Sequence, residues 1–268
     1  MDKREIWGKL TFAIIVVSAL TGCTNDVTYD VVEESRVVQL VNDDPDSPTC
    51  NVEISMPFLP SGQNGDEGRI AAKINNQVLK ELFGGEGVPR EVVSQYADHY
   101  LSAYKEDRYE YYIAECARCQ EEDKDFIVNA FSAYLWMKGE VSTGRGGIVC
   151  FAIHQDMFNG GAHPVSTTSF MNFNPVTGDE VKLSDLFLSG TLDQLTDKIT
   201  SAVASSHGVR TLADLQELGY DNIGTPQEYL IGKDSITFYY NVYEIAPYAM
   251  GPTEVRLAYK DLEGILVK

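Results

Sequence analysis

The spacing of apolar residues predicts two strands followed by two long helices in the first part of the chain. Residues 31–41 and 50–58 are predicted as two strands, and the alternation of Val52, Ile54 and Met56 is typical of a half-buried strand. Apolar residues at helical spacing predict a helix over 70–82 that stops at Gly84, and a second helix that begins near Pro89.

The remaining pattern is richer in strands. We expect an antiparallel meander, then short helices, and then two strands dense in β-branched and aromatic residues. The sequence therefore predicts an α+β fold in which a mainly antiparallel sheet packs against helices, and two long helices precede the central meander. The expected strands are residues 126–140, 147–158, 165–174, 180–183, 236–243 and 255–259. The expected helices are residues 184–187, 192–203 and 211–218, with one more capped at Thr225 and containing a proline in its first turn. Residues 262–267 are expected to form a final turn or helix.

The N-terminus has the pattern of a bacterial lipoprotein leader. Lys3, Arg4 and Lys9 precede an apolar run over 10–20 that is too short for a membrane-spanning helix. The run ends in the tetrapeptide LTGC, which resembles the bacterial lipobox, so we expect a signal peptide over 1–22 and lipid attachment at Cys23. The protein should then be exported and held at the membrane of the cell envelope by this anchor alone.

After the leader we expect a tether over 23–30, an N-terminal α+β part over 31–157 and a C-terminal part over 158–268. The last two parts are long enough to fold together as one compact unit.

The charge balance is strongly acidic. The chain holds 21 basic and 40 acidic residues, a net charge of −19. Binding to nucleic acid depends on Lys and Arg, so nucleic acid is excluded as a partner, whereas a cationic partner is favoured. High acidity also keeps a protein soluble, and this explanation stays open.

Four cysteines remain beside the one in the leader. An even number in an exported protein predicts disulfides, and three pairings are possible. The CARC segment at 116–119 allows a zinc site or a redox pair as alternatives. The disulfide candidates are Cys50, Cys116, Cys119 and Cys150.

The segment GGAHP at 160–164 predicts a sharp connection between two strands. Gly160 and Gly161 permit positive φ, and Pro164 fixes its own φ and extends the residue before it. The His163 imidazole is expected to tie this loop to a neighbouring segment, with Tyr243 as one candidate partner. The second candidate is Glu244, in a later loop that also carries Pro247 and Tyr248, and both loops form the expected binding site.

Three segments in order resemble a known extracytoplasmic domain. They are GGAHP, then NFN at 172–174 with TG at 177–178 and LSDLF at 183–187, then YEIAPYAMG at 243–251. They are similar to the C-terminal domain of the lysozyme-sensing anti-sigma factor RsiV and to a domain that precedes the catalytic domain of a peptidoglycan deacetylase. The resemblance implies an α+β module that binds lysozyme, a basic protein. The transmembrane segment of the anti-sigma factor and the catalytic domain of the deacetylase are not recognisable here.

No catalytic or metal-binding motif stands out. His154 and Asp156 share one strand face, and with His163 they could form a two-histidine, one-carboxylate set, but the spacing matches no established zinc motif. We expect no cofactor and no enzyme, and instead a binding module that recognises lysozyme or a cell-wall glycan. The alternatives are a hydrolase acting on envelope polysaccharide, with His163 and a carboxylate as acid and base, and a purely structural lipoprotein.

Overall fold

The computed structural model of the protein describes residues 27–62, 65–120, 123–161 and 163–267. The expected signal peptide and the lipidation site Cys23 lie outside this described part. Within it, no helix combines the length and the apolar character that a membrane span requires.

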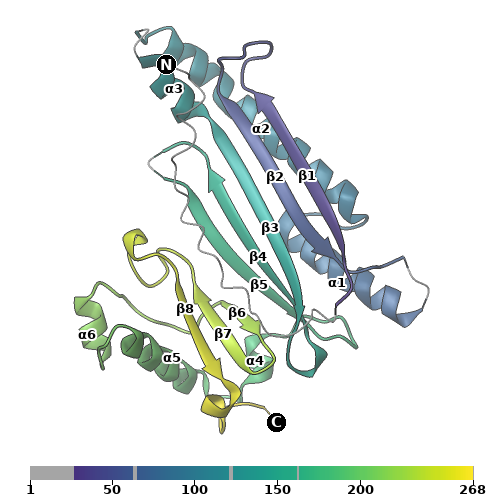
Figure 1. Cartoon of the computed structure of the whole chain (residues 1–268), viewed down its shortest axis with the longest axis vertical. Helices are drawn as coiled ribbons and strands as arrows, with labels where there is room; N and C mark the ends of the chain where they lie inside the picture. Colours follow the sequence, from purple (N-terminus) through teal and green to yellow (C-terminus); the bar gives the residue numbers. More distant parts are fainter. Residues whose placement is uncertain (1–26, 63–64, 121–122, 162, 268) are drawn as a thin grey trace, which may run out of the picture.

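A five-stranded sheet forms the larger part of the fold (Figure 1). Its order is β1-β2-β3-β4-β5, and all neighbours are antiparallel except the parallel pair of β2 and β3. A parallel pair needs a long crossover connection, and the helices between β2 and β3 provide it. The strands are β1 (Asp30–Gln39), β2 (Thr49–Phe58), β3 (Ala133–Thr143), β4 (Val149–Phe158) and β5 (Val165–Phe173).

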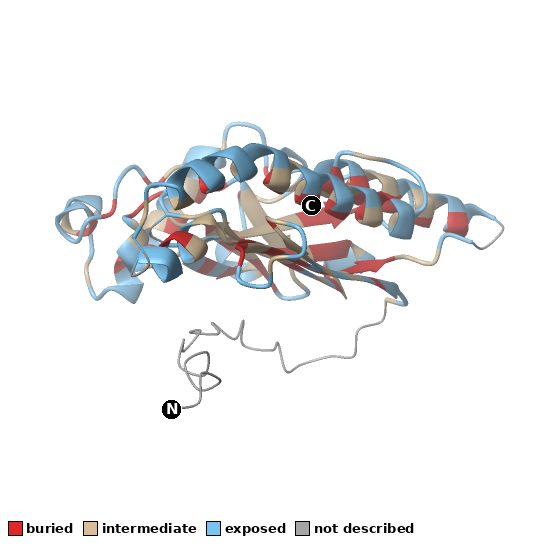
Figure 2. Ribbon diagram, turned by 90° about the horizontal axis from the view of Figure 1, so that it is seen from above, coloured by how far each residue is buried: buried red, intermediate tan, exposed pale blue. Residues whose placement is uncertain are grey.

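The crossover helices cover one face of this sheet, as Figure 2 shows. They are α1 (Asp66–Phe83), α2 (Pro89–Cys116) and α3 (Lys124–Phe131). Gly84 ends α1 in the left-handed conformation, with φ of 70°, and its N–H donates to the Lys80 carbonyl. The strand side chains that face these helices are buried with the inner sides of α1 and α2 in one core, which includes Val52, Ile54, Ile74, Val93 and Leu135.

A second, three-stranded sheet lies beside β5 (Figure 1). Its order is β6-β7-β8, all antiparallel, and a second core lies between it and its helices. The elements are α4 (Leu183–Leu186), α5 (Leu192–Ser206), α6 (Leu212–Glu217), β6 (Glu228–Ile231), β7 (Ser235–Tyr240) and β8 (Thr253–Ala258), with 3₁₀ turns η3 (Arg145–Gly147), η4 (Tyr248–Met250) and η5 (Tyr259–Leu262).

Side chains rather than a strand ladder join the two sheets. The Asn172 amide group donates to the Tyr229 carbonyl at 2.8 Å and accepts from the Ile231 N–H at 3.0 Å. Asn241 binds both the N–H and the carbonyl of Thr168, at 2.7 and 3.0 Å. These amides therefore satisfy the outer edges of β5 and β6, which would otherwise carry unpaired backbone groups.

A half-buried carboxylate adds a third link. Glu228 accepts the Phe170 N–H at 2.7 Å. Burial, the largest cause, raises the pKa of this carboxyl above its usual value, while the hydrogen bond from Phe170 opposes the shift.

The structure confirms the expected α+β class, the two long helices and the antiparallel meander of β3, β4 and β5. Three local predictions are wrong. Residues 126–131 belong to α3, where Ile127 is buried and the ring of Phe131 packs on Tyr112 at 5.5 Å. Residues 180–183 form only an isolated bridge at Glu180 before α4, and the proline turn after Thr225 leads into β6 instead of a helix, because β6 pairs with β7.

The two cores divide along the chain between Phe173 and Phe187. The expected boundary at residue 157/158 falls at the end of β4, inside the hairpin that connects it to β5. Strand pairing across this hairpin keeps β5 with the first core.

Candidate functional site

The site predicted from the sequence lies where two loops meet. One loop connects β4 to β5 and contains Gly160, Gly161 and His163, and the other connects β7 to β8 and contains Tyr243 and Tyr248. The two loops come from different sheets, so the junction between the sheets places them side by side.

The first loop is held close to the helices at its base. Gly160 has φ of 79°, and a Cβ on it would lie 2.6 Å from the Ala130 carbonyl oxygen, so only glycine fits. Beside it, the Asn159 carbonyl accepts from the Arg108 guanidinium at 2.5 Å, and the Asn159 side chain accepts from the Tyr100 hydroxyl at 3.1 Å. Gly161 has φ of 105° but open space around its α-carbon.

The second loop is anchored by buried residues on the side of the second core. Ile245 and Ala246 are buried there, and the Ile245 carbonyl accepts the Asp221 N–H at 2.7 Å. Tyr243 before them has φ of 71°, which is rare for a residue with a side chain, and its side chain is 61% exposed. The anchor therefore holds Tyr243 in a strained conformation that presents its ring to solvent.

Three aromatic rings gather where the loops meet. The His163 ring stacks on Tyr248 at 4.0 Å between centroids and 20° between planes. Tyr243 lies 5.5 Å from Tyr248 and 6.5 Å from His163. The Tyr248 hydroxyl donates to the Pro164 carbonyl at 3.2 Å, which ties the second loop to the first. We call His163, Tyr243 and Tyr248 the loop cluster.

Both nitrogens of His163 have partners. Nδ1 lies 3.0 Å from the Pro164 carbonyl oxygen and Nε2 lies 3.3 Å from the Tyr243 hydroxyl. A neutral ring with its proton on Nδ1 donates to the carbonyl and accepts from the hydroxyl, so this tautomer satisfies both contacts. Glu244 is exposed, and the described part of the chain records no hydrogen bond between it and His163. The neighbouring Pro247 is also exposed.

His154 and Asp156 point to the same face of β4, with Nε2 of the imidazole 3.5 Å from Oδ2 of the carboxylate. His154 Nδ1 also lies 3.1 Å from the Thr168 hydroxyl. His163 takes no part in this group, because its ring belongs to the loop cluster. Among the described residues, no three His, Cys, Asp or Glu side chains are grouped so that they could hold a metal ion.

The expected disulfides are absent, since all four described cysteines are free thiols. Cys50 pairs with Ala133 at one end of β3 and Cys150 pairs with Ser142 at the other, nine residues along the strand. At about 3.3 Å per residue this separates them by about 30 Å, far beyond the reach of a disulfide. Burial raises the pKa of the Cys50 thiol to about 11 and that of the Cys150 thiol to about 12.

The two other thiols lie at the end of α2. Cys116 is the last residue of the helix, and the Cys119 thiol lies 3.2 Å from the Cys116 carbonyl oxygen. Both are half-buried against the first core, and neither belongs to the loop cluster.

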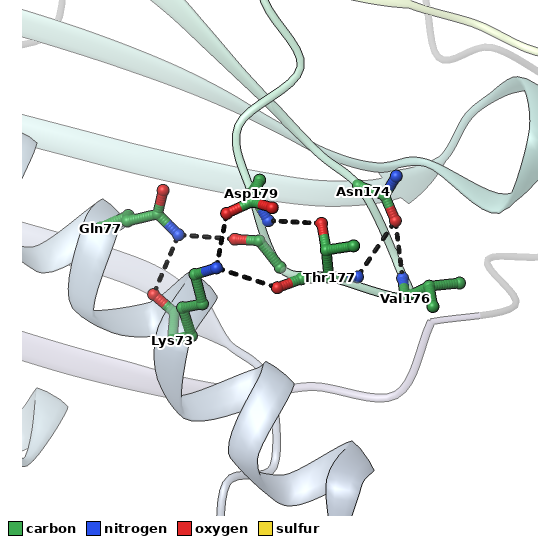
Figure 3. Close-up of polar contacts among 7 residues, drawn as sticks. Lys73, Gln77, Asn174, Val176, Thr177 and Asp179 are labelled. Atoms are coloured by element: carbon green, nitrogen blue, oxygen red, sulfur yellow. Dashed lines mark hydrogen bonds and ion pairs between the residues drawn. The ribbon is translucent and has the colours of Figure 1, made fainter.

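The central resemblance motif, NFN with TG, holds a turn against α1 (Figure 3). The Asn174 side chain accepts the N–H groups of Val176 and Thr177 at 2.8 and 3.1 Å. Lys73 of α1 then contacts the Thr177 carbonyl at 3.0 Å and the Asp179 carboxylate at 2.5 Å. These residues are accounted for by a structural role, because they dock the chain leaving β5 onto α1.

That docking contact also affects the Asp179 carboxylate. The hydrogen bond from Lys73 is the first cause that lowers its pKa below the usual value. Gln77, one turn further along α1, donates to the Gly178 carbonyl at 2.7 Å and completes the contact.

Sequence reasoning missed the amides and the carboxylate at the junction, Asn172, Asn241 and Glu228. It also missed Trp136, which lies on the face of the sheet away from the helices. Asn172 belongs to the NFN motif, but no local sequence pattern indicates that a side chain will bond the backbone of a distant strand. A polar Asn241 directly after the aromatic strand β7 was the one local hint of the junction.

Comparison with known proteins finds a family match in the C-terminal part of the chain. Residues 184–260 match the model of a family described as protein of unknown function (DUF3298). No curated protein matches the chain.

Two solved structures resemble the chain over most of its length. One is a member of the DUF3298 family from Bacteroides fragilis, with 27% identity and a TM-score of 0.75 over 92% of this chain and 96% of that one. The other, a DUF3298 family protein from Pseudomonas aeruginosa, has 16% identity and a TM-score of 0.57 over 90% and 96% of the two chains, a likeness of fold alone. Residues 184–260 therefore resemble a DUF3298 domain, a domain of unknown function, and the fold of the chain resembles that of a DUF3298 family member over most of its length.

Proposed function

We propose that this chain is a non-enzymatic binding module of the bacterial cell envelope, anchored by lipid at Cys23, which holds a cationic protein at the loop cluster. The observation that carries the proposal is the cluster of the exposed His163 and Tyr243 with the half-buried Tyr248, built from two loops on different sheets. Tyrosine is favoured at protein interfaces because its ring covers a large area with little loss of conformational entropy.

The charge of the chain supports a cationic partner. At a net charge of −19 it would attract a basic protein over a distance and accelerate the encounter. Lysozyme is such a protein, and the resemblance to the lysozyme-sensing domain gives it as the first candidate. A cell-wall glycan is the second candidate.

The arrangement around His163 argues for binding rather than catalysis. A catalytic histidine needs a free nitrogen within reach of the substrate and usually a group that orients the ring. Here one nitrogen faces a backbone carbonyl and the other a tyrosine hydroxyl.

The test is binding of the immobilised chain to lysozyme, beside cytochrome c as a similarly basic protein, at two salt concentrations. We expect tight binding to lysozyme that discriminates against cytochrome c and weakens about tenfold or more in Tyr248→Ala, the loss typical of a central interface residue. Tyr111→Ala is the matched control, because Tyr111 is a 73% exposed tyrosine on α2 that does not belong to the loop cluster. Equal binding to both proteins that salt abolishes would refute a specific module, and hydrolysis of envelope polysaccharide by the chain would establish the rival enzyme.

The anchor has its own test. Cys23→Ser should abolish incorporation of labelled fatty acid and move the protein from the membrane fraction to the soluble fraction. Unchanged fractionation and labelling would refute lipid attachment at this residue.

A further inference from the structure

The face of the five-stranded sheet away from α1 and α2 carries a group of half-buried aromatic and charged side chains. Strand residues alternate between the two faces, so those on one side enter the first core and those between them lie on the other side, which we call the open face. Figure 2 shows the helices on one side of the sheet, and no described helix covers the open face. Tyr134, Trp136, His154, Asp156 and Phe158 lie on this face, toward the end where β3 begins and β4 ends.

The second sheet covers the β5 side of the open face. Cys150 and Asn172 are buried there against the backbone of β6, and further along β5 the backbone of Thr168 is bonded to Asn241. Trp136 pairs across the strands with Asp156, six residues further along β4 than Cys150, and is only half-buried. The part of the open face around Trp136 is therefore accessible.

The aromatic side chains there are packed as two neighbouring pairs. The rings of Tyr134 and Phe158 lie 6.0 Å apart with 29° between their planes, and those of Trp136 and His154 lie 5.6 Å apart at 69°. Packed rings keep a fixed orientation, so this surface is organised before any partner arrives.

Carboxylates flank Trp136 on both sides. In the strand register Trp136 pairs with Glu53 on β2 and with Asp156 on β4, and neighbouring strands are about 4.8 Å apart. The Asp156 carboxylate is held by the Ser166 hydroxyl and lies near His154, whereas Glu53 is exposed. Lys138, the next residue of β3 on this face, is paired with Glu140 at 3.1 Å.

An aromatic face between two carboxylates attracts a guanidinium or an ammonium group. The π-electrons of indole bind a cation better than those of the other aromatic side chains, and the carboxylates add Coulomb attraction. A neutral glycan could stack on the same rings but would gain nothing from the two charges.

The open face continues into the loop cluster. Burial is the first cause that raises the pKa of the Tyr134 phenol, and the charges of Asp156 and Tyr248 add to it. These three side chains are therefore near enough to interact, and a single partner could contact both surfaces.

We propose that the open face around Trp136 is a docking surface for a cationic segment of polypeptide, with an Arg or Lys side chain over the indole between Glu53 and Asp156. The inference deepens the proposed binding function, on which it rests, by naming the second surface and the chemistry that would occupy it.

The chain offers a built-in probe of this surface. It contains two tryptophans, and Trp7 lies in the expected leader, so in the whole chain with Trp7→Phe the emission comes from Trp136 alone. We expect hexa-arginine to change this emission in a saturable way that weakens with salt, and hexaglycine to leave it unchanged. Glu53→Gln with Asp156→Asn should weaken the binding at least about threefold, as loss of exposed ion pairs predicts.

Variants separate the loss of the site from a loss of folding. Trp136→Leu keeps an apolar side chain but removes the indole, and binding of fluorescein-labelled hexa-arginine, followed by anisotropy, should fall while the thermal unfolding transition persists. Trp136→Phe should retain part of the binding because it retains an aromatic face. Glu217→Gln, at an exposed position on α6, is the control for removal of one negative charge and should bind as wild type.

Other outcomes overturn the inference. An emission change with tetra-N-acetylchitotetraose but not with hexa-arginine would assign the open face to a neutral glycan. No change with either ligand, or equal binding in the Trp136→Leu variant, would also refute it. If lysozyme binding depends on Tyr248 while the Trp136 emission stays constant, the proposed function stands and this inference fails. If hexa-arginine binds at Trp136 but lysozyme does not bind, this inference stands and the proposed lysozyme partner fails.

Discussion

Replacing Asn172 by alanine should destabilise the junction between the two sheets more than any exposed asparagine substitution. The side chain is 2% exposed, and its amide group pairs with the Ile231 N–H and the Tyr229 carbonyl of β6. Alanine would leave these two backbone groups without a partner in a buried place.

The magnitude follows from these two groups. An unsatisfied buried donor or acceptor costs about 1–3 kcal/mol, so Asn172→Ala should lower the free energy of unfolding by roughly 2–6 kcal/mol. A water that enters the vacated space would bring the loss to the lower end. Since domains are stable by only about 5–15 kcal/mol, the effect should be large in any unfolding experiment.

The assay is urea unfolding followed by far-ultraviolet circular dichroism and by Trp136 emission in the Trp7→Phe background. Circular dichroism reports on both sheets, whereas Trp136 reports on the first, so a weakened junction should also separate the two transitions. Asn51→Ala is the control, because Asn51 is exposed on β2.

A second variant tests the directional nature of the contact. Asn172→Asp keeps the acceptor for the Ile231 N–H but places a carboxylate against the Tyr229 carbonyl, so it should be destabilising at neutral pH and less so in acid, where a protonated carboxyl can donate. If Asn172→Ala and Asn51→Ala unfold within about 0.5 kcal/mol of each other, the amide does not carry the junction and the reasoning is refuted.

Three further predictions concern the loop, the half-buried carboxylate of Glu228 and the thiols. Gly161→Ala should lower the free energy of unfolding by only about 1–2 kcal/mol, the cost of a positive φ. Gly160→Ala should lower it further, because of these two positions only Gly160 would bring its Cβ against a carbonyl oxygen. Equal melting temperatures of the two variants would contradict this. The raised pKa of Glu228 means that its stabilising contribution is complete below its unfolded-state pKa, near 4.5, and is lost as pH rises through its folded-state pKa. In urea titrations Glu228→Gln should therefore be more stable than wild type at pH 7 and indistinguishable from it near pH 4. A stability difference independent of pH would show that the carboxyl titrates normally. Iodoacetamide should modify Cys116 and Cys119 in the native protein long before the buried thiols Cys50 and Cys150, as peptide mass spectrometry would show, and early labelling of Cys50 would contradict the burial of that thiol.

The order of residues alone determined the class of the fold and most of its elements. Alternation over β2, helical spacing along α1 and the glycine that ends it are local signals, and local signals fix local structure. The same holds for the sharp bend at Gly160, where the chain needs a residue without a side chain.

Residues 126–131 show where local signals fail. Their apolar character fits a strand or a helix, and packing of Phe131 on Tyr112 of α2 decides for the helix. The parallel pairing of β2 with β3 likewise depends on the long crossover between them, which no short segment encodes.

The candidate site divides in the same way. The sequence pointed to His163, Tyr243 and Tyr248 and offered Tyr243 as a partner of His163, but only the tertiary structure showed that the His163 ring stacks on Tyr248. The junction that makes this possible consists of amide side chains such as Asn172. Its amide bonds backbone groups of β6 that lie 57 and 59 residues away in sequence, where a strand ladder is absent. Such contacts are set by the distance between folded surfaces, so the sequence determined the residues that could bind, and the packing of two sheets decided that they form one surface.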